Sequence, residues 1–177
     1  AMQTNTVVQP VFMNNATDNI NYNPVVKFNG TNQFMNLDVT RLPIGTTART
    51  LIGVGKPDNV SGGRYILSWG STANTQGMGL ANINGAGYLI GYNADIPTTA
   101  GFWQLNTPNE LFGTWAGNGG VANLYSKIAQ ITTPVNKSWN TGIAAGAKIG
   151  NSWGSEYWSG PMSDVIVFDR VLNDDER

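Results

Sequence analysis

The sequence contains neither cysteine nor histidine. Without cysteine the chain has no disulfide, no thiolate metal ligand and no cysteine nucleophile. Without histidine it has no Ser-His or Cys-His catalysis and none of the usual zinc sites. Carboxylates are therefore the only ordinary acid–base groups near neutral pH. The missing cysteine neither requires nor excludes an oxidising compartment.

Charge and long apolar runs are also scarce. Asp, Glu, Lys and Arg make up 12% of the chain, and its formal net charge is −1. Lys and Arg are scattered singly, so the sequence predicts no nucleic-acid partner and no binding to acidic membranes. No apolar run approaches the roughly 18 residues of a membrane span, which predicts no membrane insertion.

Glycine is abundant, with 22 among 177 residues, and asparagine and threonine are frequent. This composition is typical of a turn-rich β protein, and the length fits one domain. Turn signals such as Asn29-Gly30 and Asn84-Gly85 separate short apolar segments, a spacing that predicts an antiparallel β-sandwich. The expected strands are Val7–Met13, Val25–Phe28, Phe34–Leu37, Thr50–Val54, Tyr65–Trp69, Gly79–Ile83, Tyr88–Tyr92, Phe102–Leu105, Thr114–Ala116, Val121–Tyr125, Ile128–Ile131, Ala147–Ile149 and Met162–Phe168.

The last segment is the most informative part of the chain. A β-branched apolar strand, Met162–Phe168, is followed by Asn173, a good helix N-cap. Glu176 lies three residues later, where its side chain can return a hydrogen bond to the N–H of the cap residue. The sequence stops one residue into this expected helix, which predicts a domain excised from a longer chain.

The same segment resembles the closing strand of laminin G-like domains, which belong to the concanavalin A-like lectin/glucanase superfamily of jelly rolls. The matching residues are Trp158, Gly160, Met162, Ser163, Asp164, Val165, Val167, Phe168, Val171, Leu172 and Glu176. Ser163 departs from the acidic residue that is commoner there.

Earlier segments extend the resemblance. Val25–Leu37 resembles the opening hairpin of that fold, and Ala48–Pro57 and Arg64–Ser71 resemble its next two strands. Val121–Ile131 is similar to a later strand and hairpin, although Ser126-Lys127 replaces the usual Asn-Gly turn. The resemblance implies a laminin G-like β-sandwich over residues 25–177. We expect residues 1–24 to form an N-terminal arm or first strand of the same domain.

Two patterns bear on catalysis. Gly150–Gly154 reads GNSWG and matches the nucleophile elbow G-x-S-x-G, but that motif needs a histidine partner and a strand–turn–helix, so a glycine-rich loop is the better interpretation. Retaining glucanases of the superfamily need two carboxylates about 5 Å apart. They place them on one strand as E-x-D-x-x-E, and Glu110, Glu156 and Glu176 have no such neighbours. The sequence predicts no enzyme.

Calcium is the candidate metal, because laminin G-like relatives often hold Ca2+ and oxygen-rich loops can supply six to eight ligands. The candidate ligands lie in three loops: Asp58, Asn59, Asn93, Asp95, Asn151 and Glu156. The alternative is that these side chains only build turns, which is the commoner role of Asn and Asp in loops.

Aromatic residues suggest sugar binding, because their rings stack on the apolar faces of pyranoses. Phe28, Tyr65, Trp69 and Phe168 lie within apolar strands, and we expect them in the core. The candidates for exposed ligand-binding aromatics adjoin loops: Tyr92, Trp103, Trp115, Trp139, Trp153 and Tyr157.

These observations favour a non-catalytic recognition module, lectin-like or adhesive, of a larger secreted or cell-surface protein. Its expected partners are a glycan or a cell-surface protein, together with neighbouring domains of the parent chain. The low charge and missing cysteine suggest a bacterial source. Two alternatives remain: a glycan-active hydrolase or lyase with dispersed carboxylates, and a purely structural spacer.

Overall fold

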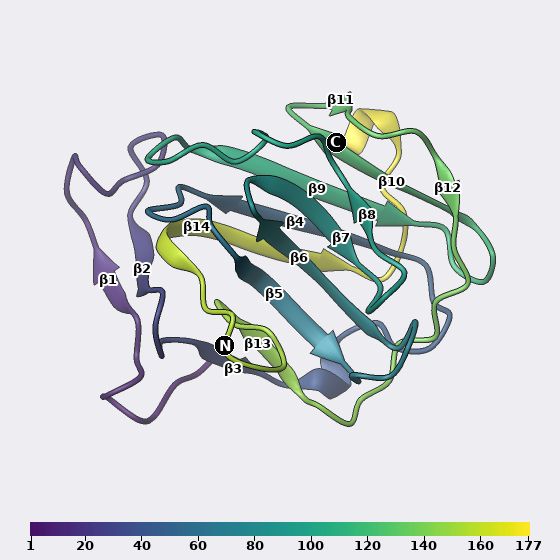
Figure 1. Ribbon diagram of the computed structural model, residues 1–177, viewed down its shortest axis with the longest axis horizontal. Coiled ribbons are helices and arrows are strands. Elements are labelled where there is room, and N and C mark those ends of the chain that lie inside the picture. Colours follow the sequence, from purple (N-terminus) through teal and green to yellow (C-terminus); the bar gives the residue numbers. More distant parts are fainter.

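Two antiparallel β-sheets packed face to face form the molecule, and the computed structural model describes all of residues 1–177 (Figure 1). This arrangement confirms the predicted all-β sandwich. The helical elements are two single 3₁₀ turns, Val39–Arg41 and Asp174–Glu176. Neither has the length or the apolar character that a helix needs to cross a bilayer.

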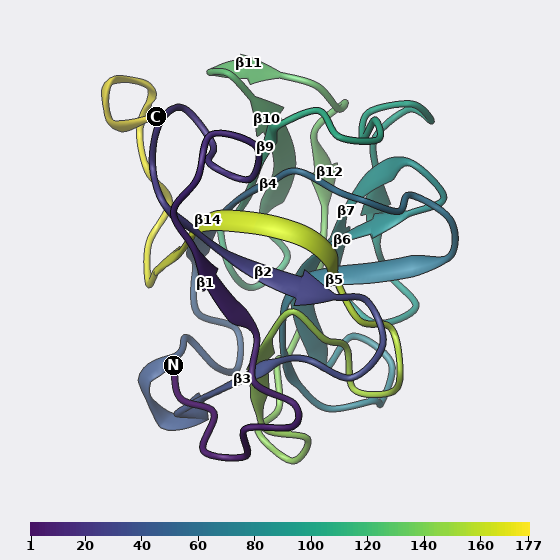
Figure 2. The ribbon, with the colours of Figure 1, turned by 90° about the vertical axis from the view of Figure 1, so that its left-hand side faces the viewer.

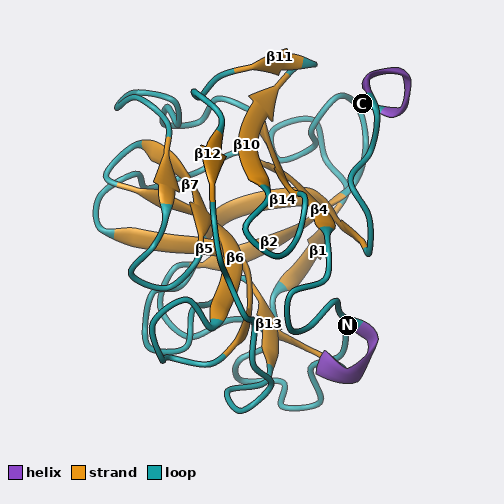
Figure 3. Cartoon of the chain, turned by 90° about the vertical axis from the view of Figure 1, so that its right-hand side faces the viewer, coloured by secondary structure: helices purple, strands orange, loops and turns teal.

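The larger sheet has eight strands in the order β1-β2-β14-β4-β9-β10-β11, and β12 also pairs with β10. The smaller sheet has six strands in the order β3-β13-β5-β6-β7-β8. Figure 2 shows β1 and β2 beside β14 on one side of the sandwich, and Figure 3 shows β10 and β12 on the opposite side. The strands are β1 (Val11–Met13), β2 (Val25–Asn29), β3 (Met35–Leu37), β4 (Arg49–Gly55), β5 (Gly63–Gly70), β6 (Gly77–Ile83), β7 (Ala86–Ile90), β8 (Ile96–Pro97), β9 (Asn109–Trp115), β10 (Val121–Ser126), β11 (Ala129–Gln130), β12 (Val135–Asn136), β13 (Ala147–Ile149) and β14 (Ser159–Phe168).

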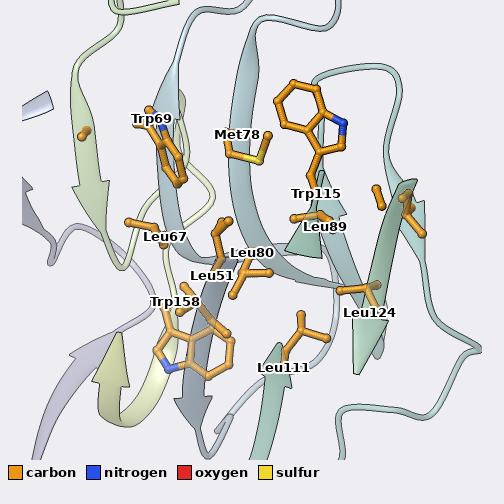
Figure 4. Packing of buried hydrophobic residues seen from close by; sticks show 14 of the residues in the cluster. Leu51, Leu67, Trp69, Met78, Leu80, Leu89, Leu111, Trp115, Leu124 and Trp158 are labelled. Atoms are coloured by element: carbon orange, nitrogen blue, oxygen red, sulfur yellow. The ribbon is translucent and has the colours of Figure 1, made fainter. Parts of the chain in front are cut away.

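The core lies between the two sheets and is built from a cluster of 18 buried residues. This cluster joins Leu51 of β4 with Leu80 and Leu89 of the facing sheet (Figure 4). Fully burying one such side chain contributes about 1.5–3 kcal/mol relative to leaving it exposed. Successive side chains of a strand alternate between the inner and the outer face of the sheet. A slip of one residue would therefore turn every inward side chain outward, and this fixes the strand register.

The turns follow the predicted glycine pattern at the β6–β7 hairpin, where Asn84 and Gly85 have φ of 51° and 83°. The β10–β11 hairpin achieves the same backbone without glycine. Lys127 and Ile128 lie there in the left-handed region, with φ of 49° and 65°. That departure from Asn-Gly, visible in the sequence, leaves local strain in this turn.

Two of the strand predictions are wrong. Phe102–Leu105 is a loop, and its apolar content serves to anchor it: Trp103 is 1% exposed and packs edge-on against Trp158 at 5.4 Å. The strand expected at Thr114–Ala116 begins at Asn109 instead. Gly113 interrupts the apolar pattern of that strand, and it is required there because a Cβ would lie 2.9 Å from Leu89.

The predicted cap at the end of the chain is confirmed. The side chain of Asn173 accepts hydrogen bonds from the N–H groups of Asp175 and Glu176, and Glu176 accepts one from the N–H of Asn173. Glu176 also binds the guanidinium of Arg170 through both oxygens, at 2.6 and 2.8 Å. This segment closes over an apolar patch on the outer face of the larger sheet, where Phe112 and Leu172 are buried.

We expect Glu176 to titrate far below an ordinary glutamate. The bond from Arg170 and the N–H of Asn173 hold the pKa of Glu176 at about 2. The pKa is lower in the folded state, so the pair contributes its full stability above about pH 4.5 and loses it as pH falls toward 2. NMR titration of the side-chain carboxyl should show this midpoint, and Arg170→Gln should raise it. Arg41→Gln is the control, and a native midpoint near 4.5 would contradict the assignment.

Candidate functional site: an aromatic hollow on the six-stranded sheet

Aromatic side chains gather on the outer face of the six-stranded sheet. Tyr65 of β5 is 7% exposed and forms a small cluster there with Ala81 and Ile90, against which Trp153 packs. The predicted burial of Tyr65 is confirmed, although it lies outside the main core cluster. The strand register shifts between Tyr65 and Leu67, and both Ile66 and Leu67 belong to the core cluster, so the bulge leaves Tyr65 on the other face.

The loop between β13 and β14 carries Trp153 onto this face. The N–H of Gly150 donates to the carbonyl of Ile66, and the N–H of Trp158 donates to the carbonyl of Gly150, which pins both ends of the loop. Within it the buried hydroxyl of Ser152 accepts hydrogen bonds from the N–H groups of Gly154 and Glu156 at 2.9 and 3.4 Å. The serine of the GNSWG motif therefore shapes a loop, in agreement with the glycine-rich-loop interpretation.

Trp153 is held between two tyrosines. Its ring lies edge to face with Tyr92 at 5.4 Å and with Tyr65 at 5.8 Å. Gly77 makes room for this packing, because a Cβ there would lie 2.8 Å from the indole ring and 3.0 Å from Cβ of Tyr92. Such pairs add about 0.5–1.5 kcal/mol beyond the area they bury, so the rings are fixed before any ligand arrives.

Tyr92 occupies a strained backbone position. Its φ is 41° and that of Asn93 is 65°, a left-handed pair with no glycine. Two contacts hold the turn: the carbonyl of Tyr92 accepts from the N–H of Thr75, and Asn93 donates to the side chain of Asn74 at 2.6 Å. Strain of this kind collects at functional sites, where the surroundings impose the conformation.

Together these residues line a hollow of about 250 Å3. Its lining includes one acidic residue, Glu156, and four residues that carry a hydroxyl: Tyr65, Thr72, Tyr92 and Ser152. Burial, and then the nearby carboxylates of Glu156 and Asp95, raise the pKa of Tyr65 above its ordinary value, which keeps this hydroxyl protonated at neutral pH. The lining residues are Tyr65, Thr72, Tyr92, Ser152, Trp153, Gly154 and Glu156.

The six predicted ligand-binding aromatics divide into two groups. Tyr92 and Trp153 line the hollow, and Tyr157 is half-buried outside it, near Phe34. The predicted exposure of the others is wrong, since each is at most 1% exposed: Trp103, Trp115 and Trp139.

The buried indoles have structural roles. Trp115 and Trp139 pack edge to face at 5.3 Å, and their N–H groups donate to the carbonyls of Lys137 and Ala94. They adjoin loops because they fasten loops to the core, so position beside a turn did not predict exposure.

The six predicted metal ligands are not gathered into one site. The chain has no group of three or more acidic side chains placed to hold a metal ion. Asp58 lies 3.8 Å from the ammonium of Lys27, Asn59 accepts from the N–H of Ser61, and Asp95 accepts from the N–H of Gly91. Asn93 donates to Asn74, as described above, and Asn151 is buried. The local bonds of Asn59 and Asp95 are those that the turn-building alternative expects.

Sequence reasoning missed Tyr65, Thr72 and Gly77 as parts of the site. One signal was present in β6, whose residues alternate between small and large as Gly77, Met78, Gly79, Leu80, Ala81. Met78 and Leu80 point into the core, so the small residues form an outer face with room for covering aromatic rings.

Solved structures of known proteins share this sandwich. Domain 4 of AbnA, an extracellular GH43 arabinanase from Geobacillus stearothermophilus solved with arabinotriose, superposes with a TM-score of 0.68 at 11% identity, over 95% of this chain and 79% of that domain. The CBM40 of the Ruminococcus gnavus IT-sialidase gives 0.65 at 12% identity, over 86% and 93%. The shared feature is the β-sandwich fold. It also matches 26% of the Trypanosoma rangeli sialidase, with a TM-score of 0.59 at 21% identity over 86% of this chain. A scan of protein-family models and a search of curated proteins found no match to the sequence.

Proposed function

We propose that this chain is a non-catalytic glycan-binding module of a secreted or cell-surface bacterial protein, and that glycan binds in the aromatic hollow. The observation that carries the proposal is the fixed pair of half-buried rings, Tyr92 and Trp153, beside the carboxylate of Glu156 and the hydroxyl of Tyr65. An aromatic ring stacks on the apolar face of a sugar, while the carboxylate and hydroxyl bond its hydroxyls. The weakly charged surface suits a neutral polyhydroxylated ligand.

The size of the hollow favours a short glycan segment. Its 250 Å3 is below the roughly 300–1,000 Å3 of pockets that enclose drug-sized ligands, which suits one sugar ring at the end of a chain or within it. A single lining carboxylate supports the non-catalytic role, because glycoside hydrolysis ordinarily uses two. Structural neighbours solved with arabinotriose and with α2,3- and α2,6-sialyllactose support glycan as the ligand class.

We further propose the laminin G-like branch of the concanavalin A-like superfamily as its family. The pairing of the first long strand, β2, with the last, β14, supports this placement. So does the position of the matching residues Trp158 and Met162, both buried in the core.

A glycan array run with Ca2+ and with EDTA tests the proposal. We expect binding to at least one array class, including arabino- and sialo-oligosaccharides as probes, and Trp153→Ala should weaken it at least about tenfold, which is about 1.4 kcal/mol. Tyr22→Ala is the matched control, since it removes an aromatic ring that is 99% exposed and outside the hollow. A silent array, or unchanged affinity of the folded Trp153→Ala protein, would refute the assignment of glycan to this hollow.

A further inference from the structure

A second hollow lies on the opposite outer face of the sandwich. It measures about 420 Å3 and sits over the eight-stranded sheet. Its floor is a row of three residues on adjacent strands, because Asp164 of β14 pairs with Val54 of β4 and Val54 pairs with Glu110 of β9. Paired residues project from the same face of a sheet, and the inward neighbour Gly53 packs on core residues, so the whole row points outward.

Three charged side chains line this hollow, and none has a partner in the protein. Glu110, Lys127 and Asp164 belong to none of the five ion pairs, and their side chains make no hydrogen bond to the protein. By contrast, Lys27 and Asp18 close by are paired at 2.7 Å. Burial raises the pKa of Glu110, which disfavours its charged form.

The N-terminal arm forms the wall of this hollow opposite the sheet, and the arm runs beside β2 (Figure 2). Ile20 is 1% exposed and begins a tight turn that ends at Asn23. These two residues exchange backbone hydrogen bonds of 3.2 and 2.9 Å. Asn21 and Asn23 face the hollow with side chains that bond to nothing else in the protein. On the other side the strained turn contributes Lys127 to the lining.

We propose that this hollow binds an unacetylated amino sugar, with its ammonium held between Glu110 and Asp164. The two Cα atoms are two strand spacings apart, about 10 Å, so both carboxylates can approach a cation lying above Val54. Asn21 and Asn23 bond the ring hydroxyls, and Lys127 repels the ammonium from the far rim, which fixes the ligand's orientation. A polar lining with only two apolar residues among ten favours a sugar over the side chain of a peptide.

Calorimetric titration with the glucosamine trimer tests this site at physiological salt. We expect Glu110→Gln and Asp164→Asn each to raise Kd at least about tenfold, the loss of one charge-assisted hydrogen bond. Asp169→Asn, which neutralises an exposed acid outside the hollow, should leave Kd unchanged. The N-acetylglucosamine trimer lacks the ammonium and should bind at least tenfold more weakly. Thermal melting verifies that each variant folds.

Three outcomes would overturn the proposal. They are absence of glucosamine-trimer binding at millimolar concentration, unchanged affinity in both hollow variants, and tighter binding of trilysine, which would assign the site to peptides. The site does not depend on the proposed function of the aromatic hollow. Trp153→Ala should leave glucosamine-trimer binding intact, so failure of one site is distinguishable from failure of the other.

Discussion

Replacing Arg49 with methionine should lower the free energy of unfolding by about 3 kcal/mol or more. The Arg49 side chain is fully buried, and its guanidinium donates hydrogen bonds to the carbonyls of Pro43, Ile44, Gly45 and Thr47 and to the hydroxyl of Thr141. Methionine fills a similar volume but removes all five bonds, which leaves the carbonyl of Thr47 and the hydroxyl of Thr141 without a donor. The carbonyls of Pro43, Ile44 and Gly45 keep one donor each, from Trp69, Thr47 and Thr141. Each unsatisfied buried group costs about 1–3 kcal/mol, partly relieved where water enters.

The charge of Arg49 has no carboxylate partner. Its guanidinium lies 5.0 Å from the ring centre of Trp115 and 5.9 Å from that of Trp69, which supply cation–π stabilisation. Burial lowers the pKa of Arg49 to about 10, so the group stays protonated at neutral pH. The cation is therefore held by carbonyl dipoles and two aromatic faces, and it ties two loops to the core.

Urea unfolding measures this effect. Arg49→Lys keeps the charge but cannot reproduce the five-donor fork, so it should fall between the wild type and Arg49→Met. Arg41→Met is the control, because the Arg41 side chain is 85% exposed, and it should change stability by less than about 0.5 kcal/mol. A loss below about 1 kcal/mol for Arg49→Met would show that water or a local shift satisfies the carbonyls.

Gly91→Ala should be the most disruptive alanine substitution at a glycine with ordinary backbone angles. A Cβ at this position would lie 1.9 Å from Nε1 of Trp139, which is fully buried and donates from that nitrogen to the carbonyl of Ala94. The indole cannot retreat, because Trp115 packs against it at 5.3 Å. Overpacking of this kind costs about 1–3 kcal/mol or more, and here it also breaks the buried hydrogen bond.

Thermal unfolding followed by tryptophan fluorescence should report this loss, because Trp139 is itself a probe. Gly154→Ala is the matched control, since the nearest atom to its added Cβ is 3.7 Å away, an ordinary contact. It should change stability by less than about 1 kcal/mol, with a small gain favoured by the reduced freedom of the unfolded chain. Equal effects of the two substitutions would mean that Trp139 can move.

Some of this structure was predictable because its causes are local. The capping box needs only Asn173 and Glu176 at the right spacing, and the β6–β7 hairpin needs only Asn84-Gly85. The sandwich follows from apolar segments and turns repeated along the chain. Such features depend on neighbours in sequence, so composition and spacing were enough to predict them.

The candidate site was harder because it depends on contacts between distant segments. Trp153 and Tyr92 were predicted as exposed aromatics, yet Trp139 has the same loop setting and is buried. The difference lies in where each loop meets the sandwich, which no local pattern encodes. The burial of Tyr65 was predicted but its place on the outer face was not, because one extra residue at a bulge reverses the face of a strand and a single sequence carries no sign of it.

The glycine-free left-handed turns have a consequence for laboratory evolution of this domain. Tyr92 and Lys127 both occupy positions where glycine would relieve strain, and each stands beside one of the two hollows. Selection for heat resistance alone should therefore favour glycine at both positions, since relieving strain is a cheap route to stability. The resulting variants would be more heat-resistant, but they would lack the aromatic ring of Tyr92 or the charge of Lys127. A library selected for thermal stability without a ligand should therefore keep the fold and lose ligand binding, which would turn the domain into a purely structural spacer.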